Sequence, residues 1–327
     1  MRYNLGMEEA IRKFGSQFDF SPVIENESKF ELRDSSVLSG MGGSHLSAGL
    51  LKIFNPALDL YIHRDYGLPP LSEKRFRSSL FIASSYSGNT EEVLDFAEKA
   101  RAKKYNLAVI TIGGKLLDFA KKNKIPYIQL PDSGIQPRSA MGFSLLALAQ
   151  LVEGDDMVTD LKQRGSKLDV AKWEKTGTEF ASGLKGKIPV IYSSRTNLPI
   201  AYNWKIKFNE TAKIPAFYNN FPELNHNEMA GFDHIPSTKD LSEKFHFIFL
   251  DDPSDHPKIM HRAQITKKLY ADRGLAVTTF QISGDTVFEK SFNSLILADW
   301  ITLNVSKMYG TVPDKVQIVE ELKKLMI

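Results

Sequence analysis

The stretch Ser84-Ser85-Tyr86-Ser87-Gly88-Asn89-Thr90 connects a predicted strand to a predicted helix. An apolar run at residues 79–83 precedes it, and the pattern at 91–100 is typical of an amphipathic helix. Asn89 or Thr90 can cap that helix, and acidic residues follow in its first turn. Hydroxyls and free backbone N–H groups at a helix start bind anions, above all phosphate. An ordinary solvated turn with a capping residue fits the same stretch.

This turn differs from the nucleotide-binding phosphate loop. It lacks the Lys and the adjacent Ser or Thr of the pattern G-x-x-x-x-G-K-[ST]. A cradle of neutral hydroxyls suits a phosphate group that stays bound while chemistry occurs elsewhere on the ligand. The stretch therefore indicates a phosphorylated metabolite that is held by its phosphate.

Around this stretch, apolar runs alternate with helical patterns, which is typical of a parallel sheet covered on both faces. The other runs of the first half lie at residues 36–39, 58–62, 106–112 and 125–130. Helical residues 141–182 lead to a second α/β pattern. It has strands at 188–194, 245–250 and 275–282 and helices at 198–213, 257–272, 287–308 and 313–326. We expect two domains, residues 1–150 and residues 151–327, the second including the bridging helix.

Composition excludes several classes of protein and site. The 327 residues contain no cysteine, so disulfides, thiolate metal sites and a cysteine nucleophile are excluded. The net charge of +3 includes no long basic block, so we expect no nucleic-acid partner. The chain shows no secretory signal pattern and no apolar run of membrane-spanning length. We therefore expect a cytoplasmic protein without a membrane partner.

Four further motifs, taken with the phosphate turn, point to one family. They are Gly40-Met41-Gly42-Gly43-Ser44, Pro137-Arg138-Ser139-Ala140-Met141-Gly142, Asn209-Glu210-Thr211-Ala212-Lys213 and Glu223-Leu224-Asn225-His226-Asn227-Glu228. In this order, and over nearly the whole chain, the sequence resembles the bifunctional phosphoglucose/phosphomannose isomerases. The resemblance implies two flavodoxin-like sugar isomerase (SIS) domains, each a parallel sheet flanked by helices. It also implies a cofactor-free enzyme that interconverts glucose-6-phosphate, and mannose-6-phosphate, with fructose-6-phosphate through a cis-enediol.

The resemblance assigns substrate binding to the first half of the chain. The residues are Gly43, Ser44, Ser85, Ser87 and Thr90. The glycine-rich loop lacks the third glycine of the dinucleotide pattern G-x-G-x-x-G, because His45 stands there. The family usually has a small residue at that position, so His45 either alters the contacts to the sugar or points away from it.

The resemblance also assigns catalytic roles to four residues. Glu210 moves a proton between C1 and C2, Arg138 stabilises the enediolate, and His226 opens the sugar ring with Lys323. The family's matching histidine comes from the neighbouring subunit, which implies a homodimer with composite sites.

Each assignment has an ordinary alternative. Glutamate, arginine and histidine are mostly surface residues, and the terminal lysines can form a solvated helix face. Lys324 and Lys307 are rivals of Lys323. His226 and Glu228 lack the spacing of a metal site, so we expect no metal.

Two other functions are compatible with SIS domains. One is a non-catalytic sugar-phosphate-binding or regulatory protein, but regulators add a helix-turn-helix reader, and roughly 30 residues before the first strand are too few for one. The other is glutamine-dependent sugar chemistry, which commonly requires a cysteine-dependent glutaminase domain. The absence of cysteine excludes a self-contained version of it.

Overall fold

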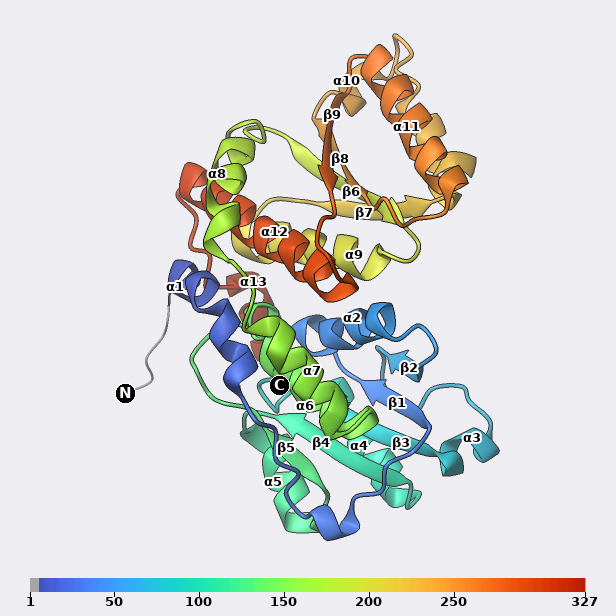
Figure 1. The fold of residues 1–327 in the computed structure, drawn as a ribbon, viewed down its shortest axis with the longest axis vertical. Coiled ribbons are helices and arrows are strands. Elements are labelled where there is room, and N and C mark those ends of the chain that lie inside the picture. The colour runs from blue at the N-terminus through green and yellow to red at the C-terminus, as the bar shows by residue number, and fades with distance from the viewer. Residues whose placement is uncertain (1–5, 327) are drawn as a thin grey trace. The chain divides into compact units, whose positions relative to one another are not determined.

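The computed structural model describes residues 6–326, which divide into two compact units between Leu168 and Asp169. Figure 1 shows that each unit consists of a parallel sheet with helices packed on its faces. This confirms the predicted α/β class for both halves of the chain.

The first unit is built on a five-stranded sheet in the order β2-β1-β3-β4-β5. Its strands, all parallel, are β1 (Ser35–Ser39), β2 (Asp59–His63), β3 (Ser79–Ser84), β4 (Asn106–Thr111) and β5 (Tyr127–Gln129). This is the order of flavodoxin-like sheets, in which ligands bind where the strand order reverses. That point lies between the carboxyl ends of β1 and β3.

Helices cover both faces of this sheet. They are α1 (Met7–Arg12), α2 (Leu46–Phe54), α3 (Glu73–Ser78), α4 (Glu91–Ala102), α5 (Gly114–Asn123), α6 (Met141–Val152) and α7 (Asp155–Gly165). Every residue of β3 is buried, because it is a central strand covered on both faces. On one face the ring of Phe81 stacks on Tyr105 at 4.9 Å and on Phe96 at 5.6 Å, measured between centroids. This core fixes the strand that precedes the phosphate turn.

The second unit has a four-stranded parallel sheet in the order β7-β6-β8-β9. Its strands are β6 (Ile188–Ser194), β7 (Phe217–Phe221), β8 (Phe245–Asp251) and β9 (Ala276–Gln281). Its helices are α8 (Glu174–Ser182), α9 (Leu198–Lys207), α10 (Lys239–Ser242), α11 (Pro257–Asp272), α12 (Val287–Tyr309) and α13 (Gln317–Leu325). The sequence did not predict β7, because an edge strand with Asn219 and Asn220 at its centre carries no continuous apolar run.

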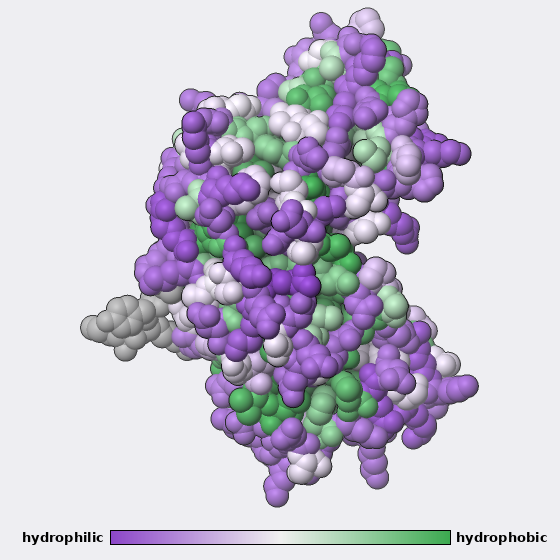
Figure 2. Space-filling model, viewed as in Figure 1, coloured by the Kyte–Doolittle hydropathy of each residue, from purple (hydrophilic) through white to green (hydrophobic). Residues whose placement is uncertain are grey.

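Polar side chains dominate the face of each unit drawn in Figure 2, with smaller apolar areas between them. Among residues 6–326, no helix is both long enough and apolar enough to span a bilayer.

Gly165 allows α7 to pack against a buried ring. A Cβ atom added to Gly165 would lie 2.0 Å from Cγ of Phe18, which is 1% exposed. We expect Gly165→Ala to destabilise the first unit by about 1–3 kcal/mol, because the overpacked ring has to move. Urea unfolding monitored by circular dichroism measures the loss.

The matched control is Gly15→Ala, whose added Cβ would meet only the carbonyl oxygen of Gly165, at 3.8 Å. Equal unfolding midpoints for the two variants would contradict this account of the packing.

Candidate active site

The phosphate turn lies between the end of β3 at Ser84 and the start of α4 at Glu91. The hydroxyl of Ser85 lies 2.8 Å from that of Thr90 and accepts a hydrogen bond from the backbone N–H of Gly88 at 3.1 Å. Ser87 is exposed, and its hydroxyl accepts from the N–H of Asn89 at 3.3 Å. The hydroxyls of Ser85 and Thr90 therefore lie together where the helix begins, and Ser87 belongs to the same turn.

Thr90 occupies the N-cap position of α4, but its side chain makes no capping hydrogen bond. Its hydroxyl bonds Ser85 instead, and the side chain of Asn89 accepts from the N–H of Lys115 at 3.1 Å. The prediction of a side-chain cap was therefore wrong. The first turn of α4 keeps N–H groups without a side-chain acceptor, as an anion site requires.

A second loop, after β4, fixes the shape of the turn. Gly88 has φ +71°, and an added Cβ there would lie 1.7 Å from the carbonyl oxygen of Gly113. The carbonyl of Gly88 in turn accepts from the N–H of Leu116 at 2.9 Å. The sequence showed Gly113-Gly114 as a break after a strand, but nothing in it indicated this contact with Gly88.

The loop after β1 also contacts the turn. The hydroxyl of Ser44 accepts from the backbone N–H of Tyr86 at 2.9 Å, and Ser84 donates to the carbonyl of Ser44 at 3.1 Å. Because a hydroxyl also has a proton to donate, Ser44 can hold the turn and still offer a hydrogen bond to a ligand.

Arg138 lies beside this same loop. A Cβ added to Gly43 would lie 2.8 Å from the carbonyl carbon of Pro137 and 2.9 Å from the backbone nitrogen of Arg138, so only glycine fits here. The Arg138 side chain is 1% exposed. The structure thus brings Gly43, Ser44 and Arg138 together with the phosphate turn.

His45 is buried within the first unit. Burial, followed by the positive charge of Arg64, lowers the pKa of His45 to about 4, against the opposing hydrogen bond with the backbone of Gly42. The imidazole is therefore neutral at pH 7.

Glu210 belongs to the second unit, on a π-helical turn, Phe208–Ala212, that continues α9. Single π turns inside helices are frequent at functional sites. The side chain is partly buried, while Lys213 donates to the backbone carbonyl of Glu210. One turn earlier, buried Lys207 pairs with Asp299 of α12 at 2.5 Å. Contacts on both sides therefore hold the turn that carries this carboxylate.

His226 is exposed at the end of a 3-10 turn, Glu223–His226. Buried Leu224 anchors the turn, and Asn225 donates to the hydroxyl of Thr266 at 2.9 Å. Glu228 accepts from Tyr192 and from Asn219, each at 2.5 Å, so both of its oxygens have partners within the protein. Across residues 6–326, no three or more His, Asp or Glu side chains group as a metal site.

The candidate lysines lie near the end of the chain. Lys323 is exposed on α13 and pairs with Glu320 at 2.8 Å. Lys324 is also exposed on α13, and Lys307 lies in the last turn of α12.

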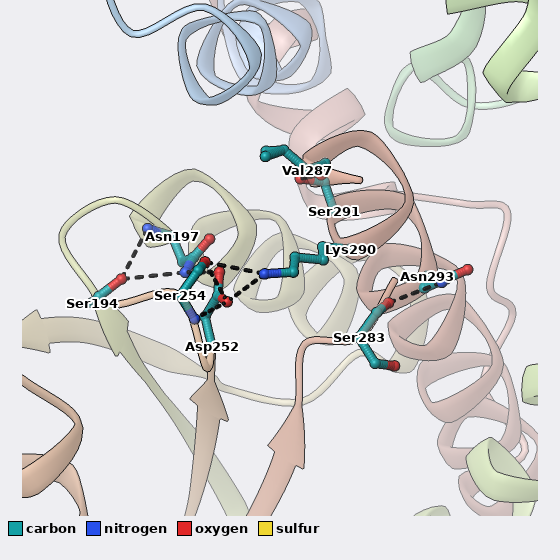
Figure 3. A network of polar contacts seen from close by, with 9 residues as sticks. All are labelled: Ser194, Asn197, Asp252, Ser254, Ser283, Val287, Lys290, Ser291 and Asn293. Atoms are coloured by element: carbon teal, nitrogen blue, oxygen red, sulfur yellow. Dashed lines mark hydrogen bonds and ion pairs between the residues drawn. The ribbon is translucent and has the colours of Figure 1, made fainter. Parts of the chain in front are cut away.

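The second sheet has its own reversal of strand order, between β6 and β8, and there several donors hold a carboxylate of the protein itself (Figure 3). Asp252 accepts from Lys290 at 2.9 Å, from the hydroxyl and N–H of Ser254 at 2.7 and 2.9 Å, and from Asn197 at 3.1 Å. Burial disfavours the charged form, but these bonds outweigh it and hold the pKa of Asp252 below its usual value. The donors that could bind an external anion at this point already bind the carboxylate of Asp252.

The close contact at Gly88 generates a test of the phosphate turn. Gly88→Ala should weaken the binding of inorganic phosphate more than about tenfold, equal to about 1.4 kcal/mol, because the added methyl group displaces the turn or the Gly113 loop. Phosphate titration followed by NMR measures the affinity.

Gly67→Ala is the matched control, because Gly67 also has positive φ (+74°) but its added Cβ would meet nothing closer than Nζ of Lys99, at 3.7 Å. If both variants lose affinity equally, the contact with Gly113 does not shape the site.

Comparisons with known proteins agree with the fold described above. Residues 174–326 match the model of the bacterial phospho-glucose isomerase C-terminal SIS domain. A protein of Caldicellulosiruptor bescii, named bifunctional phosphoglucose/phosphomannose isomerase, is 33% identical over 98% of this chain and 96% of its own length. A protein of the same name from Aquifex aeolicus is 31% identical over 97% of this chain and 98% of its own.

A solved structure of a hypothetical protein from Thermus thermophilus has the same fold, with a TM-score of 0.70 and 15% identity over 98% of this chain and 87% of that one. The motifs, the two parallel sheets and the identity along the whole chain agree. The chain belongs to the bifunctional phosphoglucose/phosphomannose isomerase family.

Proposed function

We propose that this chain interconverts glucose-6-phosphate, and also mannose-6-phosphate, with fructose-6-phosphate. The observation that carries the proposal is the turn of residues 85–90, which presents hydroxyls and uncapped N–H groups at the start of α4. Such a turn holds a phosphate group without metal or lysine. The sugar's other end is then free to reach a catalytic group.

The reaction is an internal oxidation and reduction. A base removes the proton from C2 of the open-chain aldose, and the C–H electron pair forms the double bond of a cis-enediol as the C1 carbonyl oxygen gains a proton. The base returns its proton to C1, the C2 hydroxyl loses its proton, and C2 becomes the carbonyl. C1 is reduced as C2 is oxidised, so the reaction needs no external electron acceptor. Reprotonation at C2 from either face yields glucose or mannose configuration.

Glu210 is the proposed base. A partly buried carboxylate on a turn fixed from both sides suits proton transfer between adjacent carbons, because little motion separates the two positions. Arg138 is the proposed electrophilic group, since a buried guanidinium stabilises the oxyanion of an enediolate.

Ring opening needs a second proton-transfer group. We assign it to His226, since histidine exchanges protons near neutral pH, with Lys323 as its partner at the sugar ring. The exposed position of His226 supports a role towards a neighbouring chain. We therefore propose a homodimer in which each site takes its histidine from the other protomer, acting in the cytoplasm on its phosphorylated substrates.

Incubation of the purified protein with each hexose 6-phosphate, with products separated by NMR, tests the activity. We expect glucose-6-phosphate and mannose-6-phosphate each to give fructose-6-phosphate. Binding without any product would support the non-catalytic alternative instead.

Glu210→Gln should lower kcat by about 10² or more, because the amide cannot accept the proton, while fructose-6-phosphate still binds. Kinetics and a binding titration on the same preparation measure both effects. Glu243→Gln, an exposed carboxylate of the same unit, is the control and should keep wild-type turnover. Wild-type turnover in Glu210→Gln would remove this residue from the mechanism.

Mixing two inactive variants tests the composite site. If His226 acts across the dimer, a Glu210→Gln chain and a His226→Ala chain together form one intact site and one doubly defective site. Refolding an equal mixture should then restore about a quarter of wild-type activity, because half the dimers are mixed and each has one working site. No recovery, with mixed dimers confirmed by mass spectrometry, would place both residues of a site on one chain.

A further inference from the structure

A cavity of about 650 Å³ lies in the first unit, at the amino ends of β4 and β5. Six cationic side chains line it: Lys29, Arg33, Arg77, Arg101, Lys104 and Lys124. The phosphate turn follows the carboxyl end of β3, so the two places lie at opposite ends of the same parallel sheet. The cavity is therefore separate from the proposed substrate site.

The wall of this cavity is well ordered by hydrogen bonds. The segment before β1 crosses the amino end of the sheet, where the backbones of Glu25 and Tyr127 pair at 2.8 and 3.1 Å. Asn26 donates to the carbonyl of Ile125 at 3.0 Å, and Asn106 donates to the carbonyl of Glu31 at 2.8 Å. In Figure 1 this dark-blue segment runs beside α5 at the lower end of the unit.

Most of the charge in this cavity is not neutralised by the protein. Glu31 is the one acidic residue of the lining and pairs with Arg33, while Arg77 pairs with Glu73. The other four cations of the lining make no ion pair with an acidic residue anywhere in residues 6–326. The Nε atom of Arg33 is also buried and makes no hydrogen bond there. A concave surface with unpaired positive charge concentrates anions.

Two of these cations stand where glycine is the usual residue. Lys104 and Lys124 follow the last turns of α4 and α5 with φ values of +58° and +53°. A side chain is strained in this left-handed region, which glycine enters freely. A favourable interaction with the negative carboxyl end of a helix does not explain these two lysines. Lys103 and Lys122 already place positive charge at the carboxyl ends of α4 and α5, without a left-handed backbone. Strained residues that line one cavity indicate a function for their side chains.

We propose that this cavity binds a small polyanion with two or more adjacent phosphoryl groups. Its volume matches that of ordinary ligand pockets, and adjacent phosphates can contact several separated cations at once. Free diphosphate and the phosphate chain of a nucleotide share this chemistry. The lining also includes Leu107 and Ile125, which are buried.

The test compares two pairs of substitutions by titration calorimetry with pyrophosphate and with ATP, while fructose-6-phosphate saturates the substrate site. The wild-type protein should bind one equivalent per chain. Lys104→Gly with Lys124→Gly should lose at least tenfold in affinity and yet unfold at the same temperature or higher, because glycine relieves the backbone strain. An unchanged or higher unfolding temperature would exclude misfolding as the cause of the lost affinity.

The control pair, Lys103→Gln with Lys122→Gln, removes the same charge from the same two helices outside the cavity and should keep wild-type affinity. Tighter binding of ATP than of pyrophosphate would identify a nucleotide as the ligand. Equal binding of the two would identify a free diphosphate. Equal losses in the two pairs, or no saturable binding by the wild-type protein at about 1 mM ligand, would overturn the proposal.

Discussion

The hydrogen bond from the backbone N–H of Tyr86 to the hydroxyl of Ser44 joins the two loops at the reversal of strand order in the first sheet. A parallel sheet brings the carboxyl ends of β1 and β3 to the same edge, so both loops open there. The bond decides how they meet, because it fixes one hydroxyl of the first loop against the backbone of the second. The anion-binding character of the turn depends on this arrangement, and Gly88 packed on Gly113 completes it.

The two units use the same topology in opposite ways. At the reversal point of the first sheet, neutral hydroxyls and N–H groups stand ready for an external anion. At the reversal point of the second, Asp252 takes the donors of Lys290, Ser254 and Asn197 (Figure 3). A carboxylate held in this way would repel a phosphate. Glu210, the proposed base, lies on the π turn at the far end of α9, a helix that begins directly after Asn197.

Sequence alone predicted the features that depend on local pattern. The buried central strand β3 is a continuous apolar run, and the motif around Ser85 lies between that run and a helical pattern, which predicts a strand-to-helix turn. It missed what depends on contacts between distant segments. Edge strand β7 has no apolar run, and Gly113 is 25 residues from Gly88. The π turn at Glu210 has no sequence signature, and the ion pair that lies beside it joins Lys207 to Asp299, which is 92 residues away along the chain. The residues proposed for catalysis in the second unit could therefore be predicted only from the family resemblance.

The two ends of the first sheet present donors of different kinds, and the difference follows from what each has to do. A substrate must leave after each turnover, and neutral donors at a helix start bind a phosphate without the strong attraction of full charges. Unpaired lysines and arginines bind by long-range attraction, which salt screens within about 10 Å at 0.1 M. Such a site favours a ligand with several negative charges over one with a single phosphate, because more of its cations are then neutralised at once. Lys104 and Lys124 keep a strained backbone in this cavity, which is consistent with a role for their charge in binding a ligand.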